Sequence, residues 1–150
     1  MISTIGITIR APAELVFDLA RDVERWPQLL PHYVSVSVEG HEGDAVIARF
    51  VARRELVPLL GLGIPVAWRA RAWAEPDRHQ LRFVHQGGAT AGMDVRWLIE
   101  PAAGGCRVTI VHDYRPRIAA WAVIVDGLVV RAIAGRTLRT FKALAEAVAR

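Results

Sequence analysis

Hydrophobic and polar residues along this chain follow two different periods. Residues 3–10 carry isoleucine at every second position, which is the pattern of a strand with one buried side. Pro12 then opens a stretch with helical spacing that runs to Arg21, and a second short helix begins at Asp22 and ends by Pro31. The pattern predicts one strand followed by two short helices.

Alternation returns at Tyr33 and predicts six more strands. The first of these has Val34, Val36 and Val38 on one face with serines opposite, and it joins the next strand through a turn at 41–44. The later strands are expected at 45–53, 66–74, 80–85, 91–100 and 106–114. Short connections between successive strands favour an antiparallel sheet.

The segment Leu56–Ile64 interrupts this regularity. It is apolar, but Pro58, Gly61 and Gly63 break it, so it fits neither a clean strand nor a helix. We expect a loop that packs over an apolar surface.

The last third of the chain, Ile118–Ala149, has helical spacing and contains no proline. Its apolar stripe consists of Trp121, Ile124, Val125, Leu128, Ala132, Leu138, Phe141, Leu144 and Val148. Asp126 lies in the apolar first half, where a carboxylate must face solvent or have a partner such as an arginine. Gly127 marks either a kink or a close approach of the backbone to a ligand.

A sheet with one apolar face needs a cover, and this helix is the only expected element long enough to provide it. The predicted fold is α+β: a curved antiparallel sheet of about seven strands wrapped around a long C-terminal helix, with two short helices after the first strand. Small residues among bulky ones on the inward phases predict a cavity between sheet and helix. These phases are Phe50 and Ala52; Trp68, Ala70 and Ala72; Leu81, Phe83 and His85; Met93, Val95 and Trp97; and Val108, Ile110, His112 and Tyr114.

Composition limits the classes of function. A chain of 150 residues, 53% of them hydrophobic, fits a single domain spanning 1–150. The net charge is +4, but the basic residues are scattered, which argues against a nucleic-acid surface. The apolar run of the last helix is too short to span a membrane, and Asp126 interrupts it. With a single cysteine and no visible export signal, we expect a cytoplasmic protein without a multi-cysteine metal site.

Six parts of the sequence together resemble a known protein family. They are Val16-Phe17-Asp18-Leu19, Asp22-Val23-Glu24-Arg25-Trp26-Pro27, Tyr33, Trp97, His112-Asp113-Tyr114 and residues 129–138. With these segments the whole chain resembles the START/Bet v1-like superfamily, and within it the polyketide cyclase/dehydrase group that includes coenzyme-Q-binding relatives. The resemblance implies the helix-grip fold and a deep, mostly apolar pocket, with 56–64 and 86–90 near its mouth.

The resemblance also implies residue roles. In aromatase/cyclases of this group, a tyrosine after the second helix and an arginine on a middle strand orient a poly-β-keto chain and assist its aldol closure and dehydration. Tyr33 matches the tyrosine. Ala72 occupies the position of the arginine, while Arg69 and Arg71 fall on the outward phase of the same strand.

Tyr33, His85 and His112 are the candidate catalytic residues, because aldol cyclisation needs a base for the carbon-bound proton and an acid for the alkoxide. Each is also compatible with a packed side chain whose polar atoms are satisfied. The candidate ligand-binding residues are Trp26, Phe50, Trp68, Ala72, Phe83, Met93, Trp97, Tyr114, Val125 and Leu128. No cofactor is expected, and two histidines without a third ligand make a poor metal site.

We therefore expect a protein that binds a hydrophobic polyketide, quinone or lipid, and we keep two roles open. As a polyketide cyclase, it would use Tyr33 as hydrogen-bond donor, one of the two histidines as base, and its tryptophans as walls that fold the chain. As a carrier, it would hold a lipid or quinone and could meet a membrane surface through 56–64 and the start of the last helix. The pattern leaves open whether it is a monomer or a homodimer.

Overall fold

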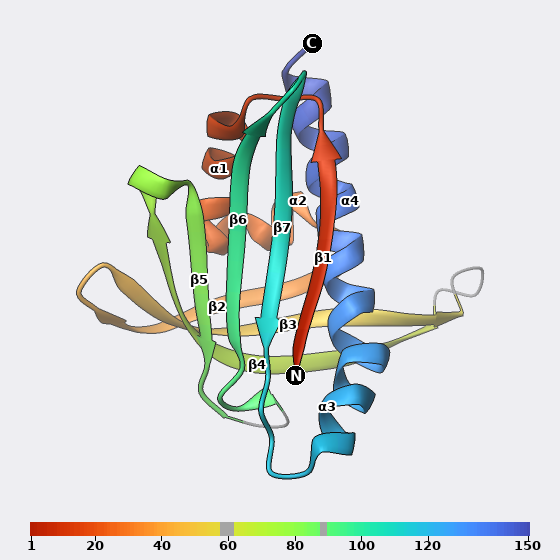
Figure 1. Ribbon diagram of the computed structural model, residues 1–150. Coiled ribbons are helices and arrows are strands. Elements are labelled where there is room, and N and C mark those ends of the chain that lie inside the picture. The colour runs from red at the N-terminus through yellow and green to blue at the C-terminus, as the bar shows by residue number, and fades with distance from the viewer. Residues whose placement is uncertain (58–61, 88–89) are drawn as a thin grey trace.

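The computed structural model describes residues 1–57, 62–87 and 90–150 and consists of one curved antiparallel sheet that faces a long helical segment (Figure 1). The sheet has the strand order β1-β7-β6-β5-β4-β3-β2. Its strands are β1 (Ile2–Ile9), β2 (Tyr33–Glu42), β3 (Ala45–Val57), β4 (Leu62–Glu75), β5 (Gln80–His85), β6 (Asp94–Ala102) and β7 (Gly105–Asp113). Strands that follow one another in sequence from β2 to β7 are neighbours, and β1 closes the order beside β7.

Two groups of helices complete the fold. After β1 come α1 (Ala13–Arg21), a 3₁₀ turn (Val23–Arg25) and α2 (Trp26–Leu29). After β7 come α3 (Ala119–Val125), a π-helical turn (Asp126–Val130) and α4 (Arg131–Val148), which follow one another without interruption. Since α4 packs against β1, β3 and α1, the C-terminal segment covers the concave face of the sheet (Figure 1). The expected strand, two helices, six strands and long helix are all present.

The inward phases read from the alternation match the burial of the side chains. Alternate residues of β5, β6 and β7 are buried, and Phe50, Ala52, Ala70 and Ala72 are buried on β3 and β4. The register aligns these residues across the sheet, because His112 pairs with Val95 and Val95 pairs with Phe83. Side chains at paired positions lie on the same face, so these residues form one continuous inner surface.

The sequence predicted that Val34 faces the same side of its strand as Val36 and Val38, and this prediction is wrong. The Val34 side chain is 50% exposed, whereas Val36 and Val38 pack against the core as expected. The cause is a register shift in β2: Tyr33 pairs with Ala52 and Ser35 pairs with the next residue, Val51. The extra residue is a β-bulge, which turns Val34 away from the sheet's inner face.

We expected a loop at 56–64, but both ends of this segment belong to β-strands. β3 extends through Val57 and β4 begins at Leu62, with Arg54 paired to Ile64. Glycine and proline do not exclude strand structure there, because both occur near the ends of long strands. Residues 58–61 lie outside the described part, so the packing expected of this loop over an apolar surface stays a prediction.

The π-helical turn changes which residues of the last helix are buried. The Arg131 amide bonds the carbonyl of Asp126, five residues earlier, so the turn contains one more residue than an α-helical turn. Of the stripe expected from the sequence, Leu138 and Phe141 are buried beyond this turn, whereas Ala132 and Val148 are exposed and Ile133 is buried instead. Gly127 lies in this turn, so the irregularity expected there is present as a π turn.

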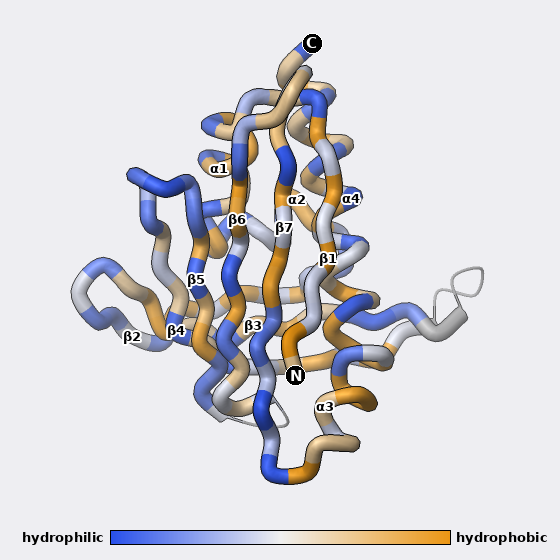
Figure 2. Tube along the Cα trace, in the orientation of Figure 1, coloured by the Kyte–Doolittle hydropathy of each residue, from blue (hydrophilic) through white to orange (hydrophobic). Residues whose placement is uncertain are grey.

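Figure 2 shows the strands with alternating hydropathy and α3 as a largely hydrophobic segment. Several of its side chains are nevertheless exposed, among them Val123 and Ile124. Of the helices that the structure describes, none combines the length and the apolar composition needed to cross a membrane.

A charge-free cavity between the sheet and the last helix

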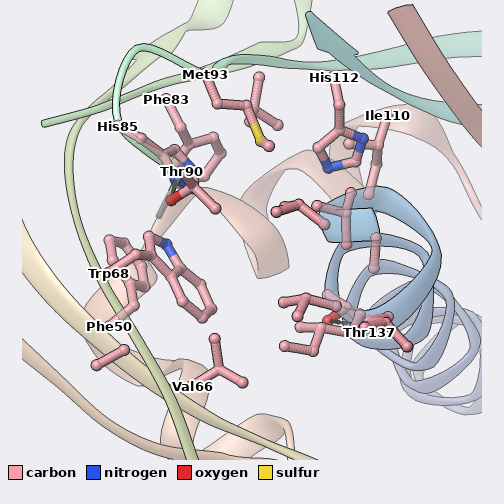
Figure 3. Close-up of a pocket in the computed structure, with 18 of the residues that line it drawn as sticks. Phe50, Val66, Trp68, Phe83, His85, Thr90, Met93, Ile110, His112 and Thr137 are labelled. Carbon is pink, nitrogen blue, oxygen red and sulfur yellow. Dashed lines mark hydrogen bonds between the residues drawn. The ribbon is translucent and has the colours of Figure 1, made fainter. Parts of the chain in front are cut away.

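A cavity of about 260 Å³ lies between the inner face of the sheet and the segment from α3 to α4 (Figure 3). Its lining comprises Trp26, Tyr33, Phe50, Val66, Ala67, Trp68, Phe83, His85, Thr90, Met93, Val95, Trp97, Ile110, His112, Trp121, Ile124, Val125, Leu128, Val129, Val130, Ile133, Ala134 and Thr137. Among the described residues, no Asp, Glu, Lys or Arg takes part in this lining. An apolar wall with a few polar groups is typical of small-molecule sites.

Aromatic rings build much of the wall. Phe50 stacks on Trp68 at 5.5 Å between ring centroids, and Trp68 stacks on His85 at 6.1 Å, with both pairs nearly parallel. These rings come from the neighbouring strands β3, β4 and β5, whose register brings Phe50 directly opposite Trp68. This stack gives the cavity an aromatic wall against which an apolar or unsaturated ligand can pack.

Trp26 is the centre of a second aromatic cluster. Its ring contacts Tyr33, Phe50, Phe83, Trp97 and Phe141, with centroid distances from 5.1 to 6.1 Å. Its indole N–H donates to the Ala20 carbonyl at 2.9 Å, and its side chain is buried. Trp26 therefore forms a fixed part of the cavity wall that is continuous with the core.

His85 reaches the cavity from the end of β5. Its Nδ1 lies 2.8 Å from Oγ1 of Thr90, which fixes the orientation of the ring. Burial, followed by the repulsion of a charge on His112, lowers the pKa of His85 to about 4. The imidazole is therefore neutral at pH 7. Figure 3 shows His85 and Thr90 on one side of the cavity and His112 on the other.

His112 enters the cavity from β7. Burial lowers its pKa to about 4, while the carboxylate of Asp126 acts in the opposite direction. Nδ1 of His112 and Oδ1 of Asp126 are both buried, and neither has a hydrogen-bond partner among the described residues. Buried polar atoms are usually paired, so these two orphaned atoms indicate a place where a ligand or water can bind.

A third polar group comes from β2 and α4. Tyr33 and Thr137 both line the cavity, and His32 lies behind them with Nε2 2.8 Å from Oγ1 of Thr137. Burial raises the pKa of the Tyr33 phenol, with a hydrogen bond to Thr137 opposing this. The phenol is therefore protonated at pH 7.

The three candidate catalytic residues thus share one cavity, and most of the candidate ligand-binding residues line it as well. The exceptions are Ala72 and Tyr114. Ala72 borders a smaller hollow under the 3₁₀ turn, and Phe83, which lines both hollows, lies between it and the cavity. Tyr114 is buried beyond the end of β7, where its carbonyl accepts a hydrogen bond from the amino group of Met1. Inward phase alone cannot tell a cavity wall from the core beside it.

The arginines near Ala72 have other partners. Arg69 forms a bidentate pair with Glu39, with N–O distances of 2.8 and 2.9 Å, and Arg71 lies 3.2 Å from Glu42. Both face outward, as the strand alternation predicted. No described arginine therefore takes the place that the family resemblance gives to a strand arginine.

Two polar lining residues, Thr90 and Thr137, were missed from the sequence. Thr137 carried a usable signal, because it lies four residues after Ile133 and four before Phe141 and so shares their buried helix face. Thr90 follows residues 88 and 89, which the structure does not describe, and no periodic pattern marks it. Among the described residues of the expected mouth segments, 56–64 and 86–90, Thr90 alone lines the cavity.

Exposed apolar side chains mark where the cavity meets solvent. Trp121, Ile124 and Leu128 line the cavity and are also exposed by between 42% and 55%. All three lie on α3 or the π-helical turn. This segment therefore covers one opening of the cavity.

Comparisons with known proteins agree with this architecture. The sequence model of the family described as "Polyketide cyclase / dehydrase and lipid transport" matches residues 3–149. The granaticin polyketide synthase bifunctional cyclase/dehydratase of Streptomyces violaceoruber is 31% identical over 115 residues, which are 75% of this chain and 33% of that protein. This chain therefore corresponds to about a third of that enzyme's length.

Solved structures show the same fold. The Zhui aromatase/cyclase from Streptomyces sp. R1128 has a TM-score of 0.81 and 17% identity, with 100% of this chain and 96% of that chain covered. A START superfamily protein from Mycobacterium smegmatis has a TM-score of 0.73 and 14% identity, with 98% of both chains covered. The helix-grip fold expected from the sequence is confirmed, and at these identities the likeness concerns the fold alone.

Proposed function

Because this chain belongs to the polyketide cyclase/dehydrase and lipid transport family, we propose that it binds an uncharged poly-β-keto chain and promotes its aldol cyclisation and dehydration. The observation that supports this most directly is the pair His85 and His112, two neutral imidazoles that face one charge-free cavity. Aldol closure and dehydration need only proton transfers, so the proposal includes no metal and no cofactor. It keeps the cytoplasmic location expected from the sequence.

The wall of the cavity favours a neutral ligand. A charged group placed there would lose its hydration without meeting an opposite charge among the described lining residues, which is costly. A poly-β-keto chain is neutral and presents flat enol and carbonyl groups. The rings of Phe50, Trp68 and His85 offer such groups an apolar aromatic wall.

We assign the base to His112, because its orphaned Nδ1 is free to accept a proton. Nδ1 takes a proton from a carbon next to a carbonyl group, and the resulting enolate carbon attacks a ketone carbon further along the chain to form the new C–C bond. The carboxylate of Asp126 stabilises the imidazolium that results. Proton return from His112 to the alkoxide gives a β-hydroxy ketone, and loss of a second carbon-bound proton and of the hydroxyl releases water.

We assign to His85 the stabilisation of negative charge that develops on the substrate. When Nδ1 of His85 accepts from the Thr90 hydroxyl, Nε2–H is left as a donor. A donor there can stabilise the carbonyl oxygen on which negative charge develops. This matters because no described arginine is available to do so.

The test is the cyclisation of heptane-2,4,6-trione, a small neutral triketone whose aldol closure and dehydration give orcinol. We expect the protein to accelerate orcinol formation, followed by chromatography, and His112→Gln to lower the accelerated rate about 100-fold. His41→Gln is the matched control, because His41 is an exposed residue near the end of β2. A rate equal to that in buffer, or a His112→Gln variant with the full rate, would refute the assignment.

A second candidate function is that of a lipid or quinone carrier that meets a membrane surface. The observation in its favour is the set of exposed apolar residues on and beside α3, including Ile118, Val123 and Ile124. Amphipathic surfaces of this kind bind bilayers when basic residues lie nearby, and Arg115 and Arg117 precede α3.

Co-sedimentation with vesicles containing phosphatidylserine distinguishes the two candidates. A carrier of this type would bind the vesicles and lose binding when Val123 and Ile124 are replaced by Ser. Val34→Ser, which changes an exposed apolar residue elsewhere, is the control. Absence of binding by the native chain would remove the membrane-bound version.

A further inference from the structure

A second hollow of about 190 Å³ lies next to the cavity. Its inner part is formed by the buried apolar side chains of Ala72, Leu81 and Phe83. Exposed carboxylates, among them Asp22 and Glu24, belong to its lining on the side of the 3₁₀ turn. The second hollow therefore has an apolar inner end and meets solvent beside that turn.

Phe83 separates the two hollows. Of the described residues, it alone lines both of them. Phe83 lies directly opposite Ala72 in the pairing of β4 with β5, so both side chains are on the inner face of the sheet. Because Ala72 ends at its Cβ, the ring of Phe83 supplies most of the bulk at this pair. The ring is therefore the partition between the cavity and the second hollow.

The partition is held in place by other aromatic side chains. The Phe83 ring lies 5.8 Å from Trp26, 6.2 Å from Phe50 and 6.4 Å from Trp97, measured between ring centroids. The Phe83 side chain is buried, as are these three neighbours. In a close-packed interior, a ring with such neighbours cannot turn aside unless they move as well. Phe83 is thus a fixed wall.

This wall closes the end of the cavity that is remote from α3. Figure 1 shows α1 and α3 toward opposite ends of β6 and β7. The opening marked by Trp121, Ile124 and Leu128 is on the α3 side, whereas the second hollow reaches Arg21 at the end of α1. A ligand that enters beside α3 therefore meets the Phe83 ring at the far end of the cavity.

We propose that Phe83 is a specificity-determining residue, whose ring limits the length of the ligand that the cavity can bury. The part of a longer ligand that exceeds this limit stays in water at the α3 opening. The inference rests on the proposed function, because it requires that the cavity bind a neutral apolar molecule. It adds a length limit and identifies the second hollow as the space that a smaller side chain at position 83 would open.

Straight-chain phenyl ketones from propiophenone to decanophenone test this limit. Successive members differ by one methylene group, and none carries a charge. Quenching of tryptophan fluorescence measures their affinity. For the native protein we expect the affinity to rise about fourfold per methylene group while the added groups are buried, and then to stop rising at a limiting chain length. In Phe83→Ala the limiting chain length should increase by at least about three methylene groups, because the two hollows then join.

Three further variants show whether the added length lies in the second hollow. Phe17→Ala is the matched control, because Phe17 is a buried phenylalanine of α1 that lines neither hollow, and it should keep the native limit. Ala72→Leu, added to Phe83→Ala, refills the second hollow and should bring the limit back toward the native length. Phe83→Leu is a milder truncation that disturbs packing less, and it should increase the limit by fewer groups than Phe83→Ala.

Two results would overturn the inference. One is a native limit in Phe83→Ala or in Phe83→Leu, for a variant that circular dichroism shows to be folded. The other is an affinity of the native protein that still rises at decanophenone. If no ketone binds the native protein, the binding cavity of the proposed function fails, and this inference fails with it. The series measures binding without turnover, so a failure to cyclise heptane-2,4,6-trione would refute the catalytic assignment alone.

Discussion

Asp126, in the π-helical turn, acts on His112 of β7 by raising the pKa of its imidazole, and each side chain has one buried atom without a hydrogen-bond partner in the described residues. A carboxylate inside an apolar helix segment is costly unless its charge is used or satisfied. Because the Asp126 carboxylate is close to a histidine that lines the cavity, its charge favours the protonated imidazole that forms when His112 acts as a base.

The first prediction concerns this pair. Asp126→Asn removes the charge but keeps the size of the side chain, so the imidazolium of His112 loses its stabilisation. We expect the rate of heptane-2,4,6-trione cyclisation to fall at least tenfold. Asp18→Asn, at an exposed position of α1, is the control. An Asp126→Asn variant as active as the native chain would assign the carboxylate to structure alone.

The second prediction concerns pH. His32, His85 and His112 have a pKa of about 4 in the folded protein, below their ordinary value of 6.5. Between these values the unfolded chain binds protons that the folded chain does not, so the free energy of unfolding falls as pH falls. The contribution is fully present above pH 6.5 and is lost on the way to about 4, at up to about 1.4 kcal/mol per pH unit for each histidine.

Urea unfolding at several pH values measures this dependence. The His112→Gln variant should show a shallower slope than the native protein between pH 6.5 and 4, while His41→Gln should keep the native slope. A free energy of unfolding that does not change over this range would contradict the burial of three neutral histidines.

The third prediction concerns Trp26, which lies at the centre of an aromatic cluster. Its contacts with five aromatic rings predict that Trp26→Ala lowers the free energy of unfolding by about 3–5 kcal/mol. Trp73 is the control, since it lies on the outer face of β4 beside Arg71 and Arg82. Its replacement by Ala should cost about 1 kcal/mol. Equal losses for both would remove Trp26 from the centre of the core.

The fourth prediction concerns Gly127. A Cβ added there meets none of the described atoms within 4 Å, and the residue is helical, so Gly127→Ala should raise the free energy of unfolding by about 0.5–1 kcal/mol. Gly105→Ala is the contrasting variant, because its Cβ would collide with the Ile9 carbonyl oxygen and must destabilise the protein. If Gly127→Ala instead weakened the binding of fluorenone, a neutral aromatic ketone, we would infer that Gly127 lets a ligand approach the backbone closely.

The alternation of hydrophobic residues predicted much of the fold because burial on one face of a strand repeats every second residue. β5 was predicted with its observed bounds, and the inward phases of β6 and β7 were correct. The period fails where the backbone adds a residue. The bulge at Val34 reverses the orientation of that residue, the π turn precedes the exposed Ala132, and neither has a hydrophobic pattern of its own.

The site was predictable only as far as residues share a face. Tyr33, His85 and His112 were identified because each lies on an inward phase or matches the family pattern. The contact between His32 and Thr137 joins the residue before β2 to α4, 105 positions apart in sequence, and no local period contains it. Ala72 shows the converse, because it shares the inward phase but lies beyond Phe83, outside the cavity.

The most direct test of the account is the affinity of the cavity for a neutral aromatic ligand relative to a charged one of the same shape. Fluorenone and fluorenone-4-carboxylate form such a pair, and quenching of tryptophan fluorescence reports their binding because Trp26, Trp68, Trp97 and Trp121 line the cavity. We expect saturable quenching by fluorenone and an affinity for the carboxylate at least about tenfold lower, the difference set by burial of an unpaired charge. Equal affinities, or no saturable quenching by fluorenone, would contradict a charge-free binding cavity and the function proposed from it.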